Sequence, residues 1–264
     1  MNTKEIDRLA REWLLEAGGI IKQEVAECKY QISEKTGPSD LVTSVDKKIE
    51  KFFAKKIAEF FPTHQLVAEE DDAHKFSTFK GVTWILDPID GTLNFVQQQA
   101  NYAISLGIFE ENHGQLAYVF DVERGSVYSC IVGEGVFVDN VKVERLRVDP
   151  SLEESLLIMN FGIIASNYLN LADAGRRARA VRLYGVASLE MMAVIVGQAD
   201  GYISRSLMPW DIAAGYIMAK ELNLEVTRID GSEINVLETG SLMIASKEVH
   251  QTLSTDYIKK TEIN

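Results

Sequence analysis

The stretch that most constrains this chain is residues 84–95, an apolar run followed by Asp-Pro-Ile-Asp-Gly-Thr. The apolar part predicts a buried strand. Pro88 fixes its own backbone and favours an extended conformation at Asp87, so we expect the strand to end at Asp87. Asp90 is then the expected N-cap of a short helix. On its own, the same pattern is equally compatible with an ordinary Asp-Pro and Asp-Gly turn.

If this stretch is a site, its charges indicate what it binds. The backbone N–H groups of Gly91 and Thr92 would lie at the N-terminus of the short helix, where an anion such as phosphate can bind. Asp87 and Asp90 would repel that anion and each other, by about 1 kcal/mol in water and roughly 4 kcal/mol near a protein surface for charges ~4 Å apart. Cations between the carboxylates and the anion would remove this repulsion.

Composition narrows the class of protein. A chain of 264 residues with 46% hydrophobic content fits one large domain or two closely packed subdomains. The net charge of −12 argues against nucleic acid and acidic membranes as partners, and it is compatible with a site for divalent cations.

Cys28 and Cys130 form neither a metal pattern nor a disulfide framework, so we expect reduced thiols. No apolar run reaches the ~20 residues of a membrane span, and no signal peptide is recognisable, so we expect a cytoplasmic protein.

The first part of the chain predicts an α+β subdomain, residues 1–146. Helical spacing predicts helices over 3–27, with Thr3 as N-cap, and over 43–61, with Asp46 in the first turn. The polar residues 34–39 between them predict a loop that can move. Alternating and apolar runs then predict an antiparallel sheet packed on the two helices, from strands 66–68, 84–87, 102–109, 115–121, 126–132 and 135–138. Of the four acids 69–72, Asp71 and Asp72 are expected in a solvated loop.

The pattern changes near residues 145–150, where we place a boundary to an α/β subdomain, residues 147–264. Strands and helices alternate in it, which predicts a mixed or parallel sheet with helices on its faces. The expected strands are 156–160, 181–184, 202–204, 224–227 and 242–245. The expected helices are 165–179, 188–196, 211–222 and 248–260.

A second acidic residue, Asp211, begins the helix that starts near Pro209. Alone it is most simply an N-cap, and the small residues after it suit close packing of the helix. Its combination with Glu69, Asp87 and Asp90 changes this interpretation, because all four carboxylates lie at the ends of elements. The four histidines are isolated along the chain. An all-oxygen ligand set selects Mg²⁺ or Mn²⁺ over zinc or copper.

Four motifs together resemble the inositol monophosphatase family, within the Mg²⁺-dependent, lithium-sensitive phosphatase superfamily. Residues 84–95 match W-x-x-D-P-x-D-G-T-x-N-F in full, and residues 210–215 match W-D-x-A-A/G-G. Residues 40–46 match D-L-V-T-x-x-D, and the family's G-E-E stands here as Ala68-Glu69-Glu70. The motifs follow in the family's order, so the resemblance covers essentially the whole chain.

The resemblance implies a hydrolase of small phosphate monoesters, built as a layered αβαβα sandwich and commonly a homodimer. It implies two or three Mg²⁺ ions, with Mn²⁺ possible in their place, that activate a water. The metal ligands it implies are Glu69, Asp87, the Ile89 carbonyl, Asp90 and Asp211. Thr92, Asp46 and Glu69 would orient and deprotonate the water. The residues it implies in contact with substrate are Lys35, Asp90, Gly91, Thr92, Gly185, Ala187, Ser204 and Asp211.

The substrate is the least constrained feature. Ser204 stands where the animal inositol phosphatases have a glutamate that binds inositol hydroxyls, so selective recognition of inositol is not implied. Relatives act on inositol 1-phosphate, fructose 1,6-bisphosphate, NADP or adenosine 3′,5′-bisphosphate, which leaves a nucleotide phosphatase as an alternative. Some bacterial members associate with the transcription machinery, which leaves a protein-binding role as an alternative from another class.

Overall fold

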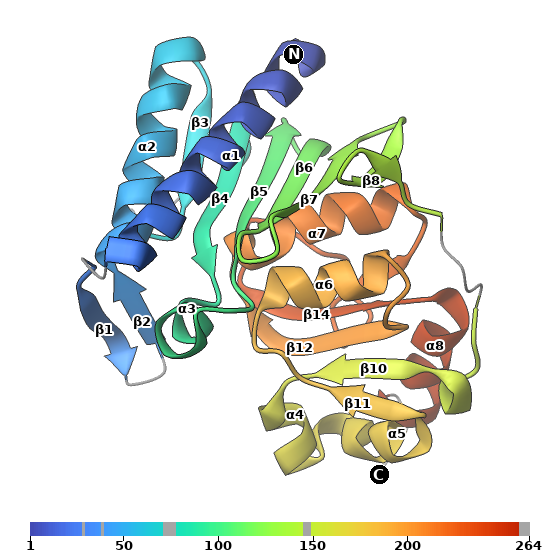
Figure 1. Cartoon of the computed structure of the whole chain (residues 1–264). Helices are drawn as coiled ribbons and strands as arrows, with labels where there is room; N and C mark the ends of the chain where they lie inside the picture. The colour runs from blue at the N-terminus through green and yellow to red at the C-terminus, as the bar shows by residue number, and fades with distance from the viewer. Residues whose placement is uncertain (28–29, 38–39, 71–77, 145–148, 259–264) are drawn as a thin grey trace.

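The structure is a computed structural model that describes residues 1–27, 30–37, 40–70, 78–144 and 149–258. Its layers alternate helix, sheet, helix, sheet and helix (Figure 1), which confirms the expected α+β sandwich. Several expectations lie outside the described residues and stay predictions: those for Cys28, Asp71, Asp72, the boundary at 146/147 and the end of the last helix.

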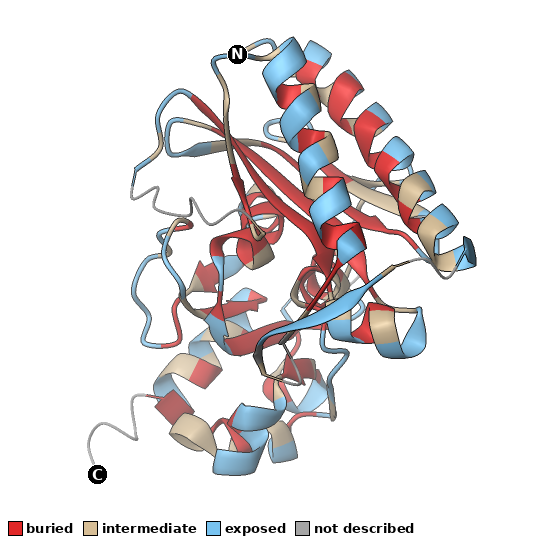
Figure 2. Cartoon of the chain, turned by 90° about the vertical axis from the view of Figure 1, so that its left-hand side faces the viewer, coloured by how far each residue is buried: buried red, intermediate tan, exposed pale blue. Residues whose placement is uncertain are grey.

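Two long helices cover the outer face of the first sheet. They are α1 (Thr3–Glu27) and α2 (Ser44–Phe60), and their buried residues lie on the side that faces the sheet (Figure 2). Thr43 caps α2 in a capping box with Asp46. The expected cap of α1 is wrong: Thr3 is already helical, and the Asn2 carbonyl accepts a hydrogen bond from the Ile6 N–H at 3.1 Å.

The expected loop at residues 34–39 is also wrong over its described part. Residues here form the strands β1 (Ile32–Gly37) and β2 (Asp40–Thr43), paired antiparallel. Polar residues with a Gly-Pro dipeptide favour a loop in an isolated sequence, but an exposed strand such as β1 needs no apolar alternation. This pair places Lys35 beside the first sheet.

The first sheet contains, in the described part of the chain, seven strands in the order β3-β4-β5-β6-β7-β8-β9. All neighbours are antiparallel except β3 and β4, which are parallel. The strand next to the β3 edge, β4, is buried along its whole length, because helices cover both faces of the sheet there. The strands are β3 (Gln65–Ala68), β4 (Val82–Asp90), β5 (Ala103–Glu110), β6 (His113–Asp121), β7 (Ser126–Ile131), β8 (Gly135–Val138) and β9 (Val141–Lys142).

The second sheet contains five described strands in the order β11-β10-β12-β14-β13, and it is mixed as expected. The expected end of a strand at Ser204 is wrong, because β12 continues to Leu207 across a register shift after Ser204. The strands are β10 (Leu156–Met159), β11 (Ala180–Arg182), β12 (Gly201–Leu207), β13 (Glu225–Thr227) and β14 (Gly240–Ala245).

The middle layer, α6 (Ala187–Ile195) and α7 (Pro209–Glu221), lies between the two sheets and joins them in one hydrophobic core. Helix α7 packs very closely on β5: a Cβ atom added at Gly107 would lie 2.8 Å from Ala213 Cβ. The small residues after Asp211 therefore bring the start of α7 against the first sheet.

Short helices cover the far face of the second sheet. The single helix expected over 165–179 is wrong: the chain forms α4 (Phe161–Ser166), a turn through Asn167 with positive φ, and α5 (Leu171–Arg177). The last helix, α8 (Lys247–Thr252), continues as a π-helix, Leu253–Ile258. The short α3 (Thr92–Gln98) lies at the end of β4. None of the described helices has both the length and the hydropathy that crossing a membrane requires.

Candidate active site

The site begins at the end of β4, which runs on through Asp90 and does not end at Asp87 as expected. Pairing with β5 shifts register between Asp87 and Asp90, which accommodates Pro88 without a ladder hydrogen bond. The Ile89 N–H donates to Asp87 Oδ1 at 3.0 Å. This irregular end of the strand brings Asp87 and Asp90 toward the same cavity.

Asp90 is not the N-cap of α3. Gly91 occupies that position with φ of 89°, and no side chain caps the helix. A glycine is favoured there because this backbone conformation strains other residues. Asp90 Oδ2 instead accepts a hydrogen bond from the Ser188 N–H at 2.6 Å, so α6 fixes its carboxylate from the other half of the chain.

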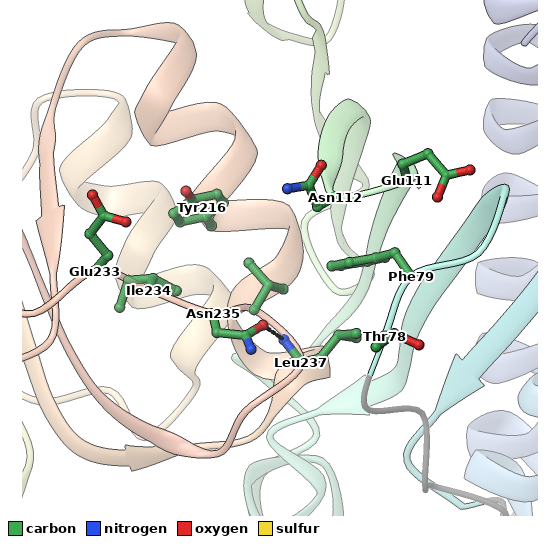
Figure 3. Close-up of a pocket in the computed structure, with 10 residues that line it drawn as sticks. Thr78, Phe79, Glu111, Asn112, Tyr216, Glu233, Ile234, Asn235 and Leu237 are labelled. Atoms are coloured by element: carbon green, nitrogen blue, oxygen red, sulfur yellow. Dashed lines mark hydrogen bonds between the residues drawn. The ribbon is translucent and has the colours of Figure 1, made fainter.

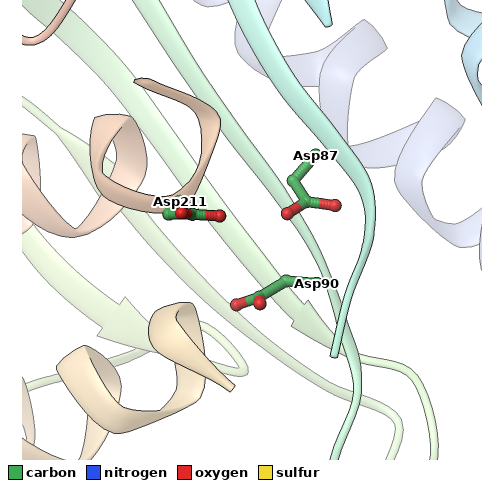
Figure 4. A group of neighbouring side chains, drawn as sticks. All are labelled: Asp87, Asp90 and Asp211. Carbon is green, nitrogen blue, oxygen red and sulfur yellow. The ribbon is translucent and has the colours of Figure 1, made fainter. Parts of the chain in front are cut away.

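Asp211 completes a cluster of carboxylates (Figure 4). It lies in the first turn of α7, where Oδ2 accepts a hydrogen bond from the Met208 N–H at 2.7 Å. Oxygen atoms of Asp87, Asp90 and Asp211 all lie within 4.8 Å of one another. Among the described residues, this is the one group of three or more such side chains that is close enough to share a metal ion.

The electrostatics of this cluster favour a cation. Asp87 is 1% exposed, and burial followed by the charges of Glu69, Asp90 and Asp211 raises its pKa well above the usual value. Burial also raises the pKa of Asp90 and that of Asp211. Buried carboxylates that repel one another are stable in ionised form only with opposite charge between them. An all-oxygen donor set of this kind fits Mg²⁺.

Glu69 reaches the same cavity from the end of β3, where it meets Lys35. Lys35 Nζ lies 2.7 Å from Glu69 Oε1 and 2.5 Å from Glu70 Oε1. Burial lowers the pKa of Lys35, but the hydrogen bonds and charges of Glu69 and Glu70 outweigh it and raise the pKa above its usual value. Lys35 therefore contacts a predicted metal ligand, from β1 and not from a loop.

Thr92 and Asp46 lie together beside the cluster. The Thr92 hydroxyl is 3.1 Å from Asp46 Oδ1 and 3.0 Å from the Ile89 carbonyl, and it can donate to either. Asp46 is fully buried, and its Oδ2 accepts hydrogen bonds from the N–H and hydroxyl of Thr43. Burial raises the pKa of Asp46 to about 6, although the bonds from Thr43 oppose the shift. Asp46 thus both closes the capping box of α2 and reaches the site.

A cavity of about 230 Å³ contains most of the predicted site residues. It is lined by Leu41, Glu69, Asp87, Ile89, Asp90, Gly91, Thr92, Leu93, Gly185 and Asp211. A larger cavity of about 560 Å³ lies between Phe79, Tyr216 and residues 233–237 (Figure 3). Its described lining includes no comparable cluster of carboxylates, so the smaller cavity is the candidate active site.

Three predicted substrate residues do not line this cavity. Lys35 contacts Glu69 and Glu70 beside it, and Ala187 is the first residue of α6. Ser204 is 2% exposed, and its hydroxyl accepts a hydrogen bond from Asn160 Nδ2 at 3.2 Å. A role for Ser204 in binding the alcohol part of a substrate stays a prediction.

Sequence reasoning missed two residues that shape the site. Asn94 lies within the first motif, and its Nδ2 donates to the Tyr184 carbonyl at 2.8 Å. Glu190 accepts hydrogen bonds from the N–H groups of Tyr184 and Gly185 at 2.6 and 2.9 Å. The position of Asn94 in the motif was a usable signal, and so was the apolar sequence around Glu190, since a helix that is apolar on all sides is buried.

Comparison with known proteins assigns the family. A model of the inositol monophosphatase family matches residues 2–262. Inositol-1-monophosphatase of Bacillus subtilis is 39% identical over 261 residues, 97% of this chain and 98% of that one. Fructose-1,6-bisphosphatase/inositol-1-monophosphatase of Thermotoga maritima is 33% identical over 77% of each chain. Nus factor SuhB of Salmonella typhimurium is 27% identical over 88% of each chain.

Solved structures agree with the sequence relatives. Staphylococcal inositol monophosphatase-1, in an inhibitory complex soaked in LiCl, has a TM-score of 0.89 and 35% identity, with 96% of this chain and 94% of that chain covered. An IMPase/NADP phosphatase in complex with Mg²⁺ and phosphate has a TM-score of 0.89 and 34% identity, with 96% and 95% covered. With its motifs, fold and carboxylate cluster all in agreement, this chain belongs to the inositol monophosphatase family, whose members are phosphoric monoester hydrolases.

Proposed function

We propose that this protein hydrolyses phosphate monoesters of small metabolites, such as inositol 1-phosphate, with Mg²⁺ as cofactor. The observation that carries the proposal is the group of oxygen atoms from Asp87, Asp90 and Asp211 within 4.8 Å of one another, in a cavity that also contains Gly91 and Thr92. Glu69 and Ile89 line the same cavity, and the Glu69 carboxylate and the Ile89 carbonyl would complete the ligand set. Bound Mg²⁺ would supply Lewis acidity and a water of lowered pKa.

The residues of the chain would then bind, orient and accept a proton. The N–H groups of Gly91 and Thr92 are proposed to hold the phosphate, next to the carboxylates that hold the metal. The Thr92 hydroxyl would orient the attacking water and donate its own proton toward Asp46 Oδ1, 3.1 Å away. A carboxylate whose pKa is about 6 is a suitable proton acceptor near neutral pH. Glu69, which lines the same cavity, is proposed to share this role.

The alcohol part of the substrate would lie toward Gly185, with Ala187, Ser204 and Lys35 as further proposed contacts. Resemblance to a fructose-1,6-bisphosphatase/inositol-1-monophosphatase and to an IMPase/NADP phosphatase supports a range of substrates wider than inositol 1-phosphate. A nucleotide phosphatase acting on NADP or adenosine 3′,5′-bisphosphate is therefore the second candidate. The homodimer, the cytoplasmic location, the number of ions and the use of Mn²⁺ stay predictions.

A phosphate-release assay tests the proposal directly. Purified protein is incubated with inositol 1-phosphate, fructose 1,6-bisphosphate, NADP or adenosine 3′,5′-bisphosphate, with Mg²⁺ or with excess chelator. We expect release that requires Mg²⁺ and that lithium inhibits. Full activity in chelator would overturn the proposed metal dependence.

A protein-binding role is favoured by one observation only, the resemblance to Nus factor SuhB. With a net charge of −12, such a role would use a protein partner in place of direct RNA binding. Binding of purified transcription factors that is equal for wild type and Asp87→Asn would separate this role from catalysis.

A further inference from the structure

The connection between β11 and α6, residues 183–186, forms part of the wall of the candidate active-site cavity. Gly185 is the residue of this connection that lines the cavity. Its φ of 77° lies in the left-handed region, which a glycine adopts without strain. Since Gly185 has no side chain, whatever binds in the cavity meets its backbone, and the position of that backbone decides the shape of the wall.

Three contacts hold the residues around this wall against the turn at the end of β4. Asn94 Nδ2 donates to the Tyr184 carbonyl at 2.8 Å. Val186 packs on Gly91 so closely that a Cβ atom at Gly91 would lie 2.7 Å from Val186 Cγ2. The Ser188 N–H donates to Asp90 Oδ2 at 2.6 Å. These contacts act from the side of the carboxylate cluster.

A fourth contact is made by Glu190 of α6, which binds the backbone of residues 184 and 185. One carboxylate oxygen, Oε1, accepts hydrogen bonds from the Tyr184 N–H at 2.6 Å and from the Gly185 N–H at 2.9 Å. Glu190 itself is 2% exposed, so the pair of bonds is shielded from water. Burial raises the pKa of Glu190, whereas the hydrogen bonds from Tyr184, Gly185 and the Tyr202 side chain oppose this rise.

Burial of the Glu190 carboxylate costs folding free energy, and close packing in α6 does not require an acid at this position. Placing a carboxylate in the interior is unfavourable unless hydrogen bonds compensate it. An apolar residue would fill the same space in α6 without that cost, but it would leave two backbone N–H groups unsatisfied. The Tyr184 residue is 46% exposed, so the connection has solvent on its other side and could turn toward it.

We propose that Glu190 is a positioning residue that fixes the Gly185 wall and thereby sets recognition of the alcohol part of the ester. This rests on the proposed function, and it adds a residue that touches neither the phosphate nor the metal. The phosphate is proposed to bind at Gly91 and Thr92, whose contacts do not include Glu190. Loss of Glu190 should therefore weaken binding of the alcohol part selectively.

The test compares Glu190→Met with Glu190→Gln. Glutamine keeps one oxygen that can accept both N–H groups, whereas methionine keeps the volume and accepts neither. For inositol 1-phosphate, we expect KM to rise roughly tenfold in Glu190→Met, from the loss of two buried hydrogen bonds, and to recover largely in Glu190→Gln. We expect kcat to fall less than KM rises. For phenyl phosphate, whose alcohol part has no hydroxyl groups to bind the wall, KM should change little.

Inhibition by inorganic phosphate separates positioning from general damage. The inhibition constant of phosphate should stay within about twofold of wild type in both variants. Asp200→Asn is the matched control, because Asp200 is equally buried at 2% and its Oδ2 accepts a hydrogen bond from the Leu156 N–H at 2.8 Å. We expect it to lower Tm and leave KM unchanged. An unchanged KM in Glu190→Met, or a phosphate inhibition constant that rises together with KM, would overturn the proposal.

Amide hydrogen exchange at Tyr184 and Gly185 gives a readout that does not depend on activity. Exchange at both positions should be faster in Glu190→Met than in wild type and intermediate in Glu190→Gln. If wild type released no phosphate from any ester, the proposed function would fail, and faster exchange would still support the hydrogen bonds from Glu190. Exchange equal to wild type would overturn the positioning role whatever the activity.

Discussion

Asp87 shows at the scale of one residue how a proposed ligand can oppose stability. It is 1% exposed, and burial and neighbouring carboxylates raise its pKa. Replacing it by asparagine removes a buried charge and keeps the shape. We expect Asp87→Asn to raise the free energy of unfolding in chelator by on the order of 1 kcal/mol or more. We also expect it to lower kcat/KM by on the order of a hundredfold or more, since even the outer partners of metal ligands matter by 10–100-fold.

Urea unfolding in chelator and a phosphate-release assay in Mg²⁺ measure the two effects. Glu123→Gln is the control, because Glu123 is an exposed carboxylate outside the cavity. Glu123→Gln should change the free energy of unfolding and kcat/KM only slightly. Equal losses of activity in the two variants would mean that the site has been assigned to the wrong residues.

The side chain of Thr92 has a proposed role in catalysis. Its hydroxyl bonds with Asp46 and with the Ile89 carbonyl, and it does not cap α3. We expect Thr92→Ala to lower kcat by about 10²–10⁴-fold, the usual contribution of positioned proton transfer. The free energy of unfolding should fall by only about 1 kcal/mol, the usual value of one hydrogen bond. A large loss of stability with little loss of kcat would assign Thr92 a structural role.

At the scale of elements, the close packing of α7 on β5 brings Asp211 to Asp87. A Cβ atom at Gly107 would lie 2.8 Å from Ala213 Cβ and 3.0 Å from the Ala213 carbonyl carbon. We therefore expect Gly107→Ala to push α7 outward, to lower the free energy of unfolding by about 1–3 kcal/mol and to weaken Mg²⁺ binding. Urea unfolding and the Mg²⁺ dependence of Tm check both effects.

Gly19→Ala is the matched control for this substitution. Gly19 lies within α1 and has no atom within 4 Å of an added Cβ. Alanine is favoured over glycine inside helices, so this variant should be more stable than wild type by about 0.5–1 kcal/mol. It should bind Mg²⁺ as wild type does. Gly107→Ala with unchanged Mg²⁺ binding would show that the spacing of α7 and β5 does not control the ligand set.

Most elements were predictable from local pattern, and the failures have identifiable physical causes. The period of apolar residues predicted α1, α2 and the described strands of both sheets except the short, exposed β9, since one face of each must be buried. The β1–β2 pair was missed because the exposed β1 lacks that alternation. The break between α4 and α5 was missed because residues with positive φ there, such as Leu169, are not glycines.

At the scale of the whole molecule, the carboxylate cluster links stability to pH and to Mg²⁺. Burial raises the pKa of Asp46 and of Asp90 from 3.8 to about 6 and that of Asp211 from 3.8 to about 8. An acid whose pKa is higher in the folded protein binds more protons when folded. The metal-free protein should therefore lose stability from this source as pH rises from about 4 to about 8.

Mg²⁺ should reverse this trend, because it binds the ionised carboxylates. The rise in Tm that Mg²⁺ produces should be larger at pH 8 than at pH 5, which differential scanning calorimetry measures directly. Asp211→Asn should reduce this difference between pH 8 and pH 5, since it removes the carboxyl whose pKa is about 8. A rise in Tm that is the same at both pH values would contradict the proposed ligand set.

The sequence by itself determined the composition of the site and the order of the elements. The ligand types, the glycine after Asp90 and the family follow from short motifs, because these requirements concern a few adjacent residues and their backbone. Apolar periodicity likewise determined which segments became helices and strands, because burial of one face is a local demand on side-chain spacing.

Only the tertiary structure decided which of these residues act together. The packing of α7 on Gly107 brings Asp211 to Asp87, and Ser188 fixes Asp90 from a distant part of the chain. The connection that carries Gly185 is likewise held from a distant part of the chain, by Asn94 Nδ2, which donates to the Tyr184 carbonyl. Each depends on contacts between residues far apart in sequence, whose distances arise from the packing of whole layers and leave no periodic or motif signal in one chain.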